Sequence, residues 1–140
     1  MLDIDSRDTQ DIMQDFINAP NDFERMWLLC SRQLAITEKL GPELASAVLR
    51  LNLVKDINYL RSQAEINRWC IRLYKNCLSL GIARSDAAPE ELVPLVTSAT
   101  VSIVYDWCKA KGAFPLFKTV RRAVEVLYGV RPEFCRSETM

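Results

Sequence analysis

The spacing of apolar residues predicts helices along most of the chain. Apolar side chains recur every three or four residues, which is the spacing of one face of an α-helix. No alternating run of β-branched residues is long enough for a convincing strand. All four glycines, at positions 41, 81, 112 and 129, fall at expected helix ends, where glycine commonly terminates a helix. We therefore expect an all-α fold, a helical bundle of about six helices.

Two helices are expected before residue 41. The first begins near Asp8 and ends before Pro20. The second runs from an N-cap at Asn21 to Leu40. Glu24 stands three residues after this cap, in the position of a capping-box partner whose carboxylate bonds back to the cap. The expected inward residues of the second helix are Phe23, Met26, Trp27, Cys30 and Leu34.

Two more helices are expected before residue 82. Gly41 and Pro42 turn the chain into the third. Its expected inward residues are Leu44, Ala45, Val48, Leu49 and Leu53. The fourth has Ser62 as its cap, with Glu65 three residues later, and ends at Gly81. Its apolar stripe comprises Ile66, Trp69, Cys70, Leu73, Cys77 and Leu80.

The last third of the chain predicts a helical hairpin. One helix is expected over 89–111, because Pro89 suits a first helical turn and the carboxylates of Glu90 and Glu91 complement the helix dipole. A second helix is expected over 115–129. Only three residues separate the two, so we expect them to fold back as an antiparallel pair.

This hairpin has more apolar surface than one core requires. The helix over 89–111 is apolar nearly all the way round, and its small residues at 97–100 would let another helix approach closely. The last helix carries one broad apolar stripe, with Arg121, Arg122 and Glu125 expected on its solvent-facing side. We therefore expect a homodimerisation hairpin. Its candidate interface residues are Val101, Val104, Trp107, Cys108, Phe117, Val120, Val124 and Leu127.

Length and charge favour one domain over residues 1–140, with 1–7 and 131–140 flexible. Eighteen basic and eighteen acidic residues give zero net charge, which disfavours a module that binds nucleic acid by itself. The first residues are acidic where a signal peptide would be basic, and no apolar run is long enough to span a bilayer. We expect a cytoplasmic protein that does not bind a membrane.

No group of side chains suggests catalysis or metal binding. The chain has no histidine, and its five cysteines are irregularly spaced without a CxxC pair, which excludes most zinc sites and a disulfide framework. Cys70 and Cys77 are two helical turns and roughly 10 Å apart, too far for a disulfide. We expect both to be buried, and Cys135 to be the most reactive thiol solely because it is exposed in the polar tail. Because no phosphate loop or acid–base pair is present, we predict that the protein is not an enzyme and needs no metal or cofactor.

Three predicted helices carry one tryptophan each, at positions 27, 69 and 107. Ordinary core packing explains such residues, but they could also line a cavity between helices, where bundles usually place ligands. The mixed side chains on these faces suit a small, mostly apolar effector. The candidate pocket residues are Met26, Trp27, Cys30, Leu34, Trp69, Leu73, Cys77, Thr100 and Tyr105.

The sequence resembles the TetR family of bacterial transcription regulators. The runs 81–86 (Gly-Ile-Ala-Arg-Ser-Asp) and 89–92 (Pro-Glu-Glu-Leu) are similar to the stretch around the start of the penultimate helix of the family's regulatory domain. Trp107, the turn 112–116 and the run 126–129 are similar to the family's ending. The resemblance implies that the last two helices pair with a symmetry mate as a four-helix bundle, while earlier helices enclose an effector pocket.

Two features depart from the family. Only twenty residues precede the helix starting at Asn21, too few for the family's helix-turn-helix head, so we expect DNA to be contacted only through a domain absent from this chain. Pro94 lies inside the penultimate helix, where it removes one backbone hydrogen bond.

The leading hypothesis is that the chain is the effector-binding and homodimerisation domain of a TetR-like transcription regulator. The alternative is a stand-alone helical interaction protein that pairs with another regulator, and this hypothesis predicts a preference for a different partner.

Overall fold

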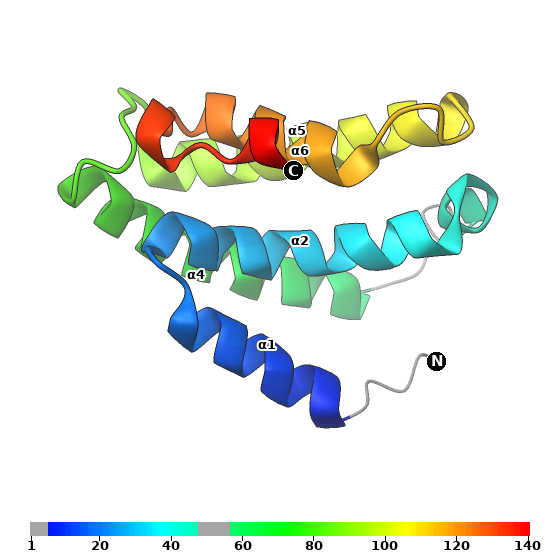
Figure 1. The fold of residues 1–140 in the computed structure, drawn as a ribbon, viewed down its shortest axis with the longest axis horizontal. Coiled ribbons are helices and arrows are strands. Elements are labelled where there is room, and N and C mark those ends of the chain that lie inside the picture. The colour runs from blue at the N-terminus through cyan, green and yellow to red at the C-terminus, as the bar shows by residue number, and fades with distance from the viewer. Residues whose placement is uncertain (1–5, 48–56) are drawn as a thin grey trace.

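The computed structural model describes residues 6–47 and 57–140. Within these ranges the backbone is mostly helical, which confirms the prediction of an all-α bundle (Figure 1). The α-helices are α1 (Ser6–Asn18), α2 (Asp22–Leu40), α4 (Ile57–Ser79), α5 (Pro89–Lys109) and α6 (Leu116–Leu127). Two short 3-10 helices follow, η1 (Pro132–Phe134) and η2 (Ser137–Thr139).

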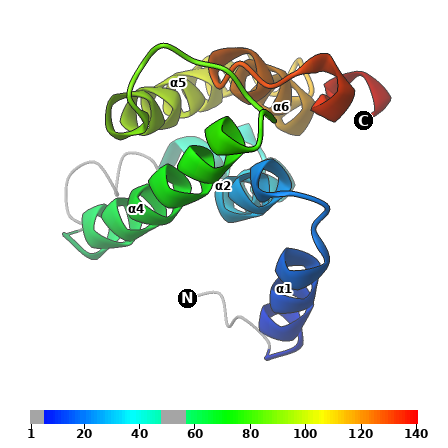
Figure 2. The same cartoon turned by 90° about the vertical axis from the view of Figure 1, so that its left-hand side faces the viewer.

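Four helices enclose the core in two layers. Helices α2 and α4 form one layer, and the hairpin of α5 and α6 covers it as the other (Figures 1 and 2). Contacts of α4 with α5 and of α2 with α6 close the bundle. Helix α1 packs on α2 and projects away from the α5–α6 layer (Figure 2). Each of the four enclosing helices therefore has one face directed at a shared interior.

Local signals fix both ends of α2. The side-chain Oδ1 of Asn21 accepts a hydrogen bond from the backbone N–H of Glu24 at 2.9 Å, so the predicted N-cap is confirmed. Gly41, at φ 85°, ends the helix, and its N–H donates to the carbonyl of Thr37. The predicted capping box is only half formed, however. The carboxylate of Glu24 does not bond back to the cap, because it pairs with an arginine of α6 instead.

Helix α4 begins earlier than predicted and presents a different face. It starts at Ile57, so the predicted cap at Ser62 is wrong and this residue lies inside the helix. From residue 64 onwards, its buried positions are Cys70, Leu73, Tyr74 and Cys77. This buried face differs from the predicted stripe, which included Trp69 and Leu80. These two side chains are exposed by 53% and 72%.

The predicted third helix is described only in part. Residues 42–47 are helical, and Ala45 is buried as expected. Leu44 is half exposed, which contradicts its expected inward position. The other inward residues predicted there, Val48, Leu49 and Leu53, lie outside the described residues.

A backbone clasp ties the α4–α5 connection to the segment after α6. Ala83 and Val130 form an antiparallel bridge, and the N–H of Arg84 donates to the carbonyl of Gly129 at 2.9 Å. Gly129 is at φ 63°, and a Cβ there would lie 2.0 Å from the carbonyl oxygen of Arg84. Only glycine fits such an approach. The clasp thus fixes both ends of the α5–α6 layer against α4.

Candidate functional site

A cavity of about 130 Å³ lies inside the bundle. Helix α2 contributes Met26, Trp27, Leu29, Cys30, Gln33, Leu34 and Thr37 to its wall. Helix α5 contributes Val93, Val96, Thr97, Thr100, Val101 and Val104. Ile66 and Cys70 of α4, with Val124 and Tyr128 at the end of α6, complete it. All four helices of the core therefore form the cavity.

The lining is mostly apolar, and the hydroxyl groups of Thr100 and Thr37 are engaged within their own helices. The hydroxyl of Thr100 donates to the carbonyl of Val96 at 3.0 Å, and that of Thr37 donates to the carbonyl of Gln33 at 2.7 Å. Because these hydrogens satisfy carbonyls of their own helices, they are not free donors for a ligand. The cavity therefore favours ligands that gain from apolar contact rather than from many hydrogen bonds.

Two thiols meet in the wall of this cavity. The Sγ atoms of Cys30 in α2 and Cys70 in α4 are 3.8 Å apart and within hydrogen-bonding distance for sulfur. The contact with Cys70 lowers the pKa of Cys30, while the same contact, together with burial, raises the pKa of Cys70. Cys30 is half-buried, whereas Cys70 is almost fully buried. The two thiols thus differ in both acidity and access.

The structure brings together five of the nine predicted pocket residues: Met26, Trp27, Cys30, Leu34 and Thr100. Trp69 lies on the exposed side of α4, where the guanidinium of Arg72 covers its ring, so its assignment to the pocket is wrong. Leu73 and Cys77 are buried but do not line the cavity. Tyr105 is half-buried and also lies away from it. Tyr128, which was not predicted, does line the cavity. Its backbone carbonyl accepts a 2.7 Å hydrogen bond from the hydroxyl of Tyr74.

The structure also corrects the predicted dimer interface. Trp107 and Val120 are buried in the chain's own core, and Val104 and Val124 are buried in the cavity wall together with half-buried Val101. Cys108 and Phe117 are half-buried against the core, with Phe117 packed edge-on against Trp27. Of the predicted interface, only Leu127 is exposed. Most of the apolar side chains that were predicted to contact a partner are therefore packed into the core of a single chain.

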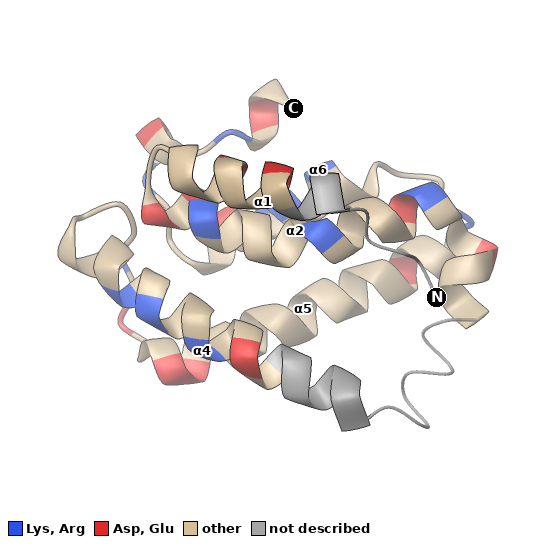
Figure 3. Ribbon diagram, turned by 90° about the horizontal axis from the view of Figure 1, so that it is seen from below, with Lys and Arg blue, Asp and Glu red and all other residues tan. Residues whose placement is uncertain are grey.

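A different apolar surface remains on the hairpin. A shallow groove on α6 is lined by Pro115, Lys118, Thr119, Arg122, Ala123, Val126 and Leu127. Leu95 of α5 is also exposed. Helix α5 has no charged residue between Glu91 and Asp106, which is visible as its long tan stretch in Figure 3. Exposed apolar side chains on this hairpin are therefore accessible to a partner.

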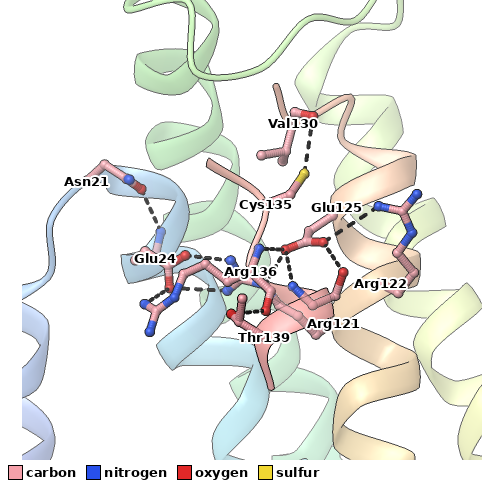
Figure 4. A network of polar contacts seen from close by, with 10 residues as sticks. Asn21, Glu24, Arg121, Arg122, Glu125, Val130, Cys135, Arg136 and Thr139 are labelled. Carbon is pink, nitrogen blue, oxygen red and sulfur yellow. Dashed lines mark hydrogen bonds and ion pairs between the residues drawn. The ribbon is translucent and has the colours of Figure 1, made fainter. Parts of the chain in front are cut away.

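A buried ionic network lies beside the cavity (Figure 4). Arg121 has no exposed surface, and its guanidinium donates to both carboxylate oxygens of Glu24, at 2.5 and 3.1 Å, and from Nε to Glu125 at 2.9 Å. The same guanidinium lies over the rings of Phe23 and Trp27, at 4.7 and 5.3 Å from their centroids. The predicted solvent-facing position is thus wrong for Arg121 and Glu125, although Arg122 is exposed as expected.

Glu125 holds the C-terminal segment in place. Its carboxylate accepts hydrogen bonds from the backbone N–H groups of Arg136 and Ser137, at 2.6 and 3.2 Å, and from the Ser137 hydroxyl at 2.6 Å (Figure 4). Burial alone would raise the pKa of Glu125, but these hydrogen bonds and Arg121 outweigh it, so that its pKa is lowered. The segment after η1 is therefore anchored on α6, unlike the flexible tail predicted over 131–140.

Cys135 does not have the properties expected of the most reactive thiol. It is half-buried, and its Sγ lies 3.6 Å from the carbonyl of Val130, to which it donates (Figure 4). Burial and the neighbouring Glu125 raise its pKa. A thiol with a raised pKa holds little thiolate, which is the nucleophilic form. The structure therefore contradicts the exposure on which the prediction for Cys135 rested.

Comparisons with known proteins do not assign the chain to a family. A scan against protein-family models, a search of curated proteins and a search of solved structures each find no match. The part of the chain that the structure describes contains no group of three or more Cys, Asp or Glu residues placed to hold a metal ion. Nor does any helix within it combine the length and apolar character needed to cross a membrane.

Proposed function

We propose that this chain is a regulatory domain that binds a small, mostly apolar effector in the cavity between α2, α4, α5 and α6. The cavity is the observation that carries the proposal. Its volume of about 130 Å³ is close to that of an apolar protein cavity that accepts benzene. Its position between the helices of a bundle is where such folds usually hold ligands. The resemblance of residues 81–129 to the regulatory domain of TetR-like regulators supports the same function.

The lining defines the class of effector. A single aromatic ring or a short branched alkyl chain fills the volume, while a sugar or a nucleotide would leave many polar groups without partners. Trp27 and Tyr128 supply aromatic surface, and Val96 and Val104 supply aliphatic surface. Gln33, at the exposed edge of the wall, is the one uncharged amide that could meet a polar substituent. We therefore expect simple aromatics to bind better than linear polar compounds of the same size.

Thermal unfolding in the presence of benzene, toluene and indole tests this proposal. A ligand at a hundred times its dissociation constant adds about 2.7 kcal/mol of stability, which should raise Tm by roughly 5–10 °C. Trp27 fluorescence should change in parallel, because its ring lines the cavity. Val96→Phe fills the cavity and should abolish both responses. Ile103→Phe, on the same helix but outside the lining, should retain them. Ligands that shift neither Tm nor fluorescence in the wild type would refute the effector site.

Self-association is the second part of the proposal. The groove on α6 and the exposed Leu95 of α5 both lie on the hairpin, which is the element that pairs in TetR-like regulators. Val126 and Leu127 are the exposed apolar residues at the end of this groove. The regulatory domain would thus be joined to its copy through a face different from the one that encloses the effector. Contact with DNA would belong to a separate domain.

The same groove also favours the second candidate, a helical protein that pairs with another regulator. Lys118 and Arg122 give the groove two positive charges and no negative charge, so an acidic partner surface would complement it better than an identical copy does. Sedimentation alone and with a candidate regulator separates the two functions. A ligand-responsive homodimer supports the effector domain, whereas a monomer that forms a stoichiometric complex supports the interaction protein.

A further inference from the structure

We propose that Cys30 and Cys70 form an oxidisable thiol pair, which hydroperoxides convert into a disulfide between α2 and α4. Their Sγ atoms are 3.8 Å apart, and a disulfide requires about 2.05 Å. The two sulfurs belong to helices that pack directly against each other. Both line the cavity, which leaves their side chains room to rotate towards one another. The inference does not depend on which molecule the cavity binds.

No other two of the five cysteines, all of which the structure describes, make such an Sγ–Sγ contact. Cys77 is fully buried, and burial raises its pKa to about 12. It lies two turns from Cys70 on the same helix, a separation that a disulfide cannot bridge. Cys135 donates to a backbone carbonyl and has a raised pKa. A cross-link formed in the folded protein should therefore be specific to one pair.

Access and acidity assign different roles to the two sulfurs. Cys30 is half-buried, and the contact with Cys70 lowers its pKa, so it is the thiol that a small oxidant reaches as thiolate. Cys70 is almost fully buried with a raised pKa, and it can only react with a neighbour. We assign Cys30 as the attacking thiol and Cys70 as the resolving thiol.

The reaction balances with hydrogen peroxide as the oxidant. The Cys30 thiolate attacks one peroxide oxygen, an S–O bond forms, the O–O bond breaks, and the leaving hydroxide takes up the thiol proton as water. The sulfur of Cys70 then attacks the sulfenic acid at Cys30, an S–S bond forms, the S–O bond breaks, and a second water leaves. Overall two thiols lose two electrons and two protons, and one peroxide is reduced to two waters.

The product would join two walls of the cavity covalently. Cys30 and Cys70 are 40 residues apart in the sequence, so the bond closes a long loop in the unfolded chain and should stabilise the fold. It would also fix the separation of α2 and α4 on which the cavity's width depends. Oxidation should therefore raise Tm by several degrees, and dithiothreitol should reverse the change.

Peptide mapping of the folded protein tests the inference directly. After treatment with hydrogen peroxide, free thiols are blocked by alkylation and the chain is digested with trypsin without reduction. Trypsin places Cys30 in the peptide 26–32, Cys70 in 69–72 and Cys77 in 76–84. We expect a linked pair of the first two peptides, lighter by two hydrogen atoms than their sum, and the loss of two alkylation sites.

Matched variants show whether the pair is specific. Cys30→Ser and Cys70→Ser should each abolish the linked peptides, whereas Cys77→Ser, buried on the same helix as Cys70, should leave them unchanged. Wild-type protein oxidised in guanidinium should give mixed linkages, because the specificity comes from the fold. The inference is overturned if folded wild-type protein gives Cys30 sulfinic acid without linkage, links that involve Cys77, Cys108 or Cys135 in equal amount, or no oxidation at either sulfur.

Discussion

Arg121 of α6 and Glu24 of α2 are 97 residues apart in sequence and form a bidentate ion pair inside the protein. The guanidinium has no exposed surface, so water cannot replace either carboxylate oxygen. Glu125 and the faces of Phe23 and Trp27 occupy its remaining surroundings. Because breaking such a pair leaves an uncompensated buried charge, its members depend on each other far more than exposed ions do.

Removing the buried guanidinium should therefore destabilise the fold severely. Arg121→Ala leaves Glu24 and Glu125 buried without their shared partner, and we expect a loss of about 3–5 kcal/mol in the free energy of unfolding. Its neighbour Arg122 is exposed, and Arg122→Ala should change stability by less than about 0.5 kcal/mol. Urea unfolding of the two variants measures the difference. Equal midpoints would show that the network does not stabilise the fold.

Glu125 predicts a loss of stability in acid. Its folded-state pKa lies below its ordinary value, so the unfolded chain binds this proton more tightly than the folded protein. The stabilising contribution is complete above the ordinary glutamate pKa of about 4.3 and is lost as pH falls through the lower folded pKa. Glu125→Gln should flatten this part of the stability profile. Glu133→Gln, at an exposed carboxylate, is the control and should keep the wild-type slope.

The backbone clasp predicts a strong effect at one glycine. In Gly129→Ala the new Cβ would meet the Arg84 carbonyl at 2.0 Å, and the residue would also be held at φ 63°. Gly81→Ala, at φ 72°, adds the same kind of strain, about 1–2 kcal/mol, but its nearest neighbour is the mobile end of Arg131 at 3.7 Å. Thermal unfolding should thus show a clearly larger decrease in Tm at position 129 than at position 81.

The oligomeric state tests the revised association surface. Sedimentation should give twice the chain mass of 16.0 kDa, and Val126→Glu should reduce it to that of the monomer without loss of helicity. Leu80→Glu replaces another exposed apolar residue, directly after α4, and should remain dimeric. Val104→Glu and Val124→Glu, at buried positions, should unfold the chain instead. A monomeric wild type would exclude the homodimer.

The sequence predicts helix ends well, because their signals are local. Asn21 and Gly41 act through the backbone within one turn, and both lie where the pattern indicates a helix end. Ser62 resembles such a cap, yet α4 continues through it. A cap residue permits a helix to begin but does not require it, so a cap-like residue alone cannot place the end of a helix.

The candidate site was predictable only in part, since it depends on contacts between distant segments. The cavity lies between the helices expected to form it, but which face of α4 points inward depends on α2 and α5, and this placed Trp69 outside. The spacing of apolar residues around Arg121 indicates a buried position, but its charge led to the prediction of an exposed one. This residue lies four after Phe117 and three before Val124, within the apolar stripe. No local rule could name Glu24 as the partner that makes its burial possible.

The span between Glu24 and Arg121 also affects how the protein is made. At a synthesis rate of 5–20 residues per second, the ribosome needs roughly 5–20 s to add the residues that separate them. During this interval the nascent α2 has a carboxylate on the face that it must later bury, and burial without a counterion is unfavourable. We therefore expect the emerging N-terminal half to stay accessible to chaperones until α6 has left the ribosome.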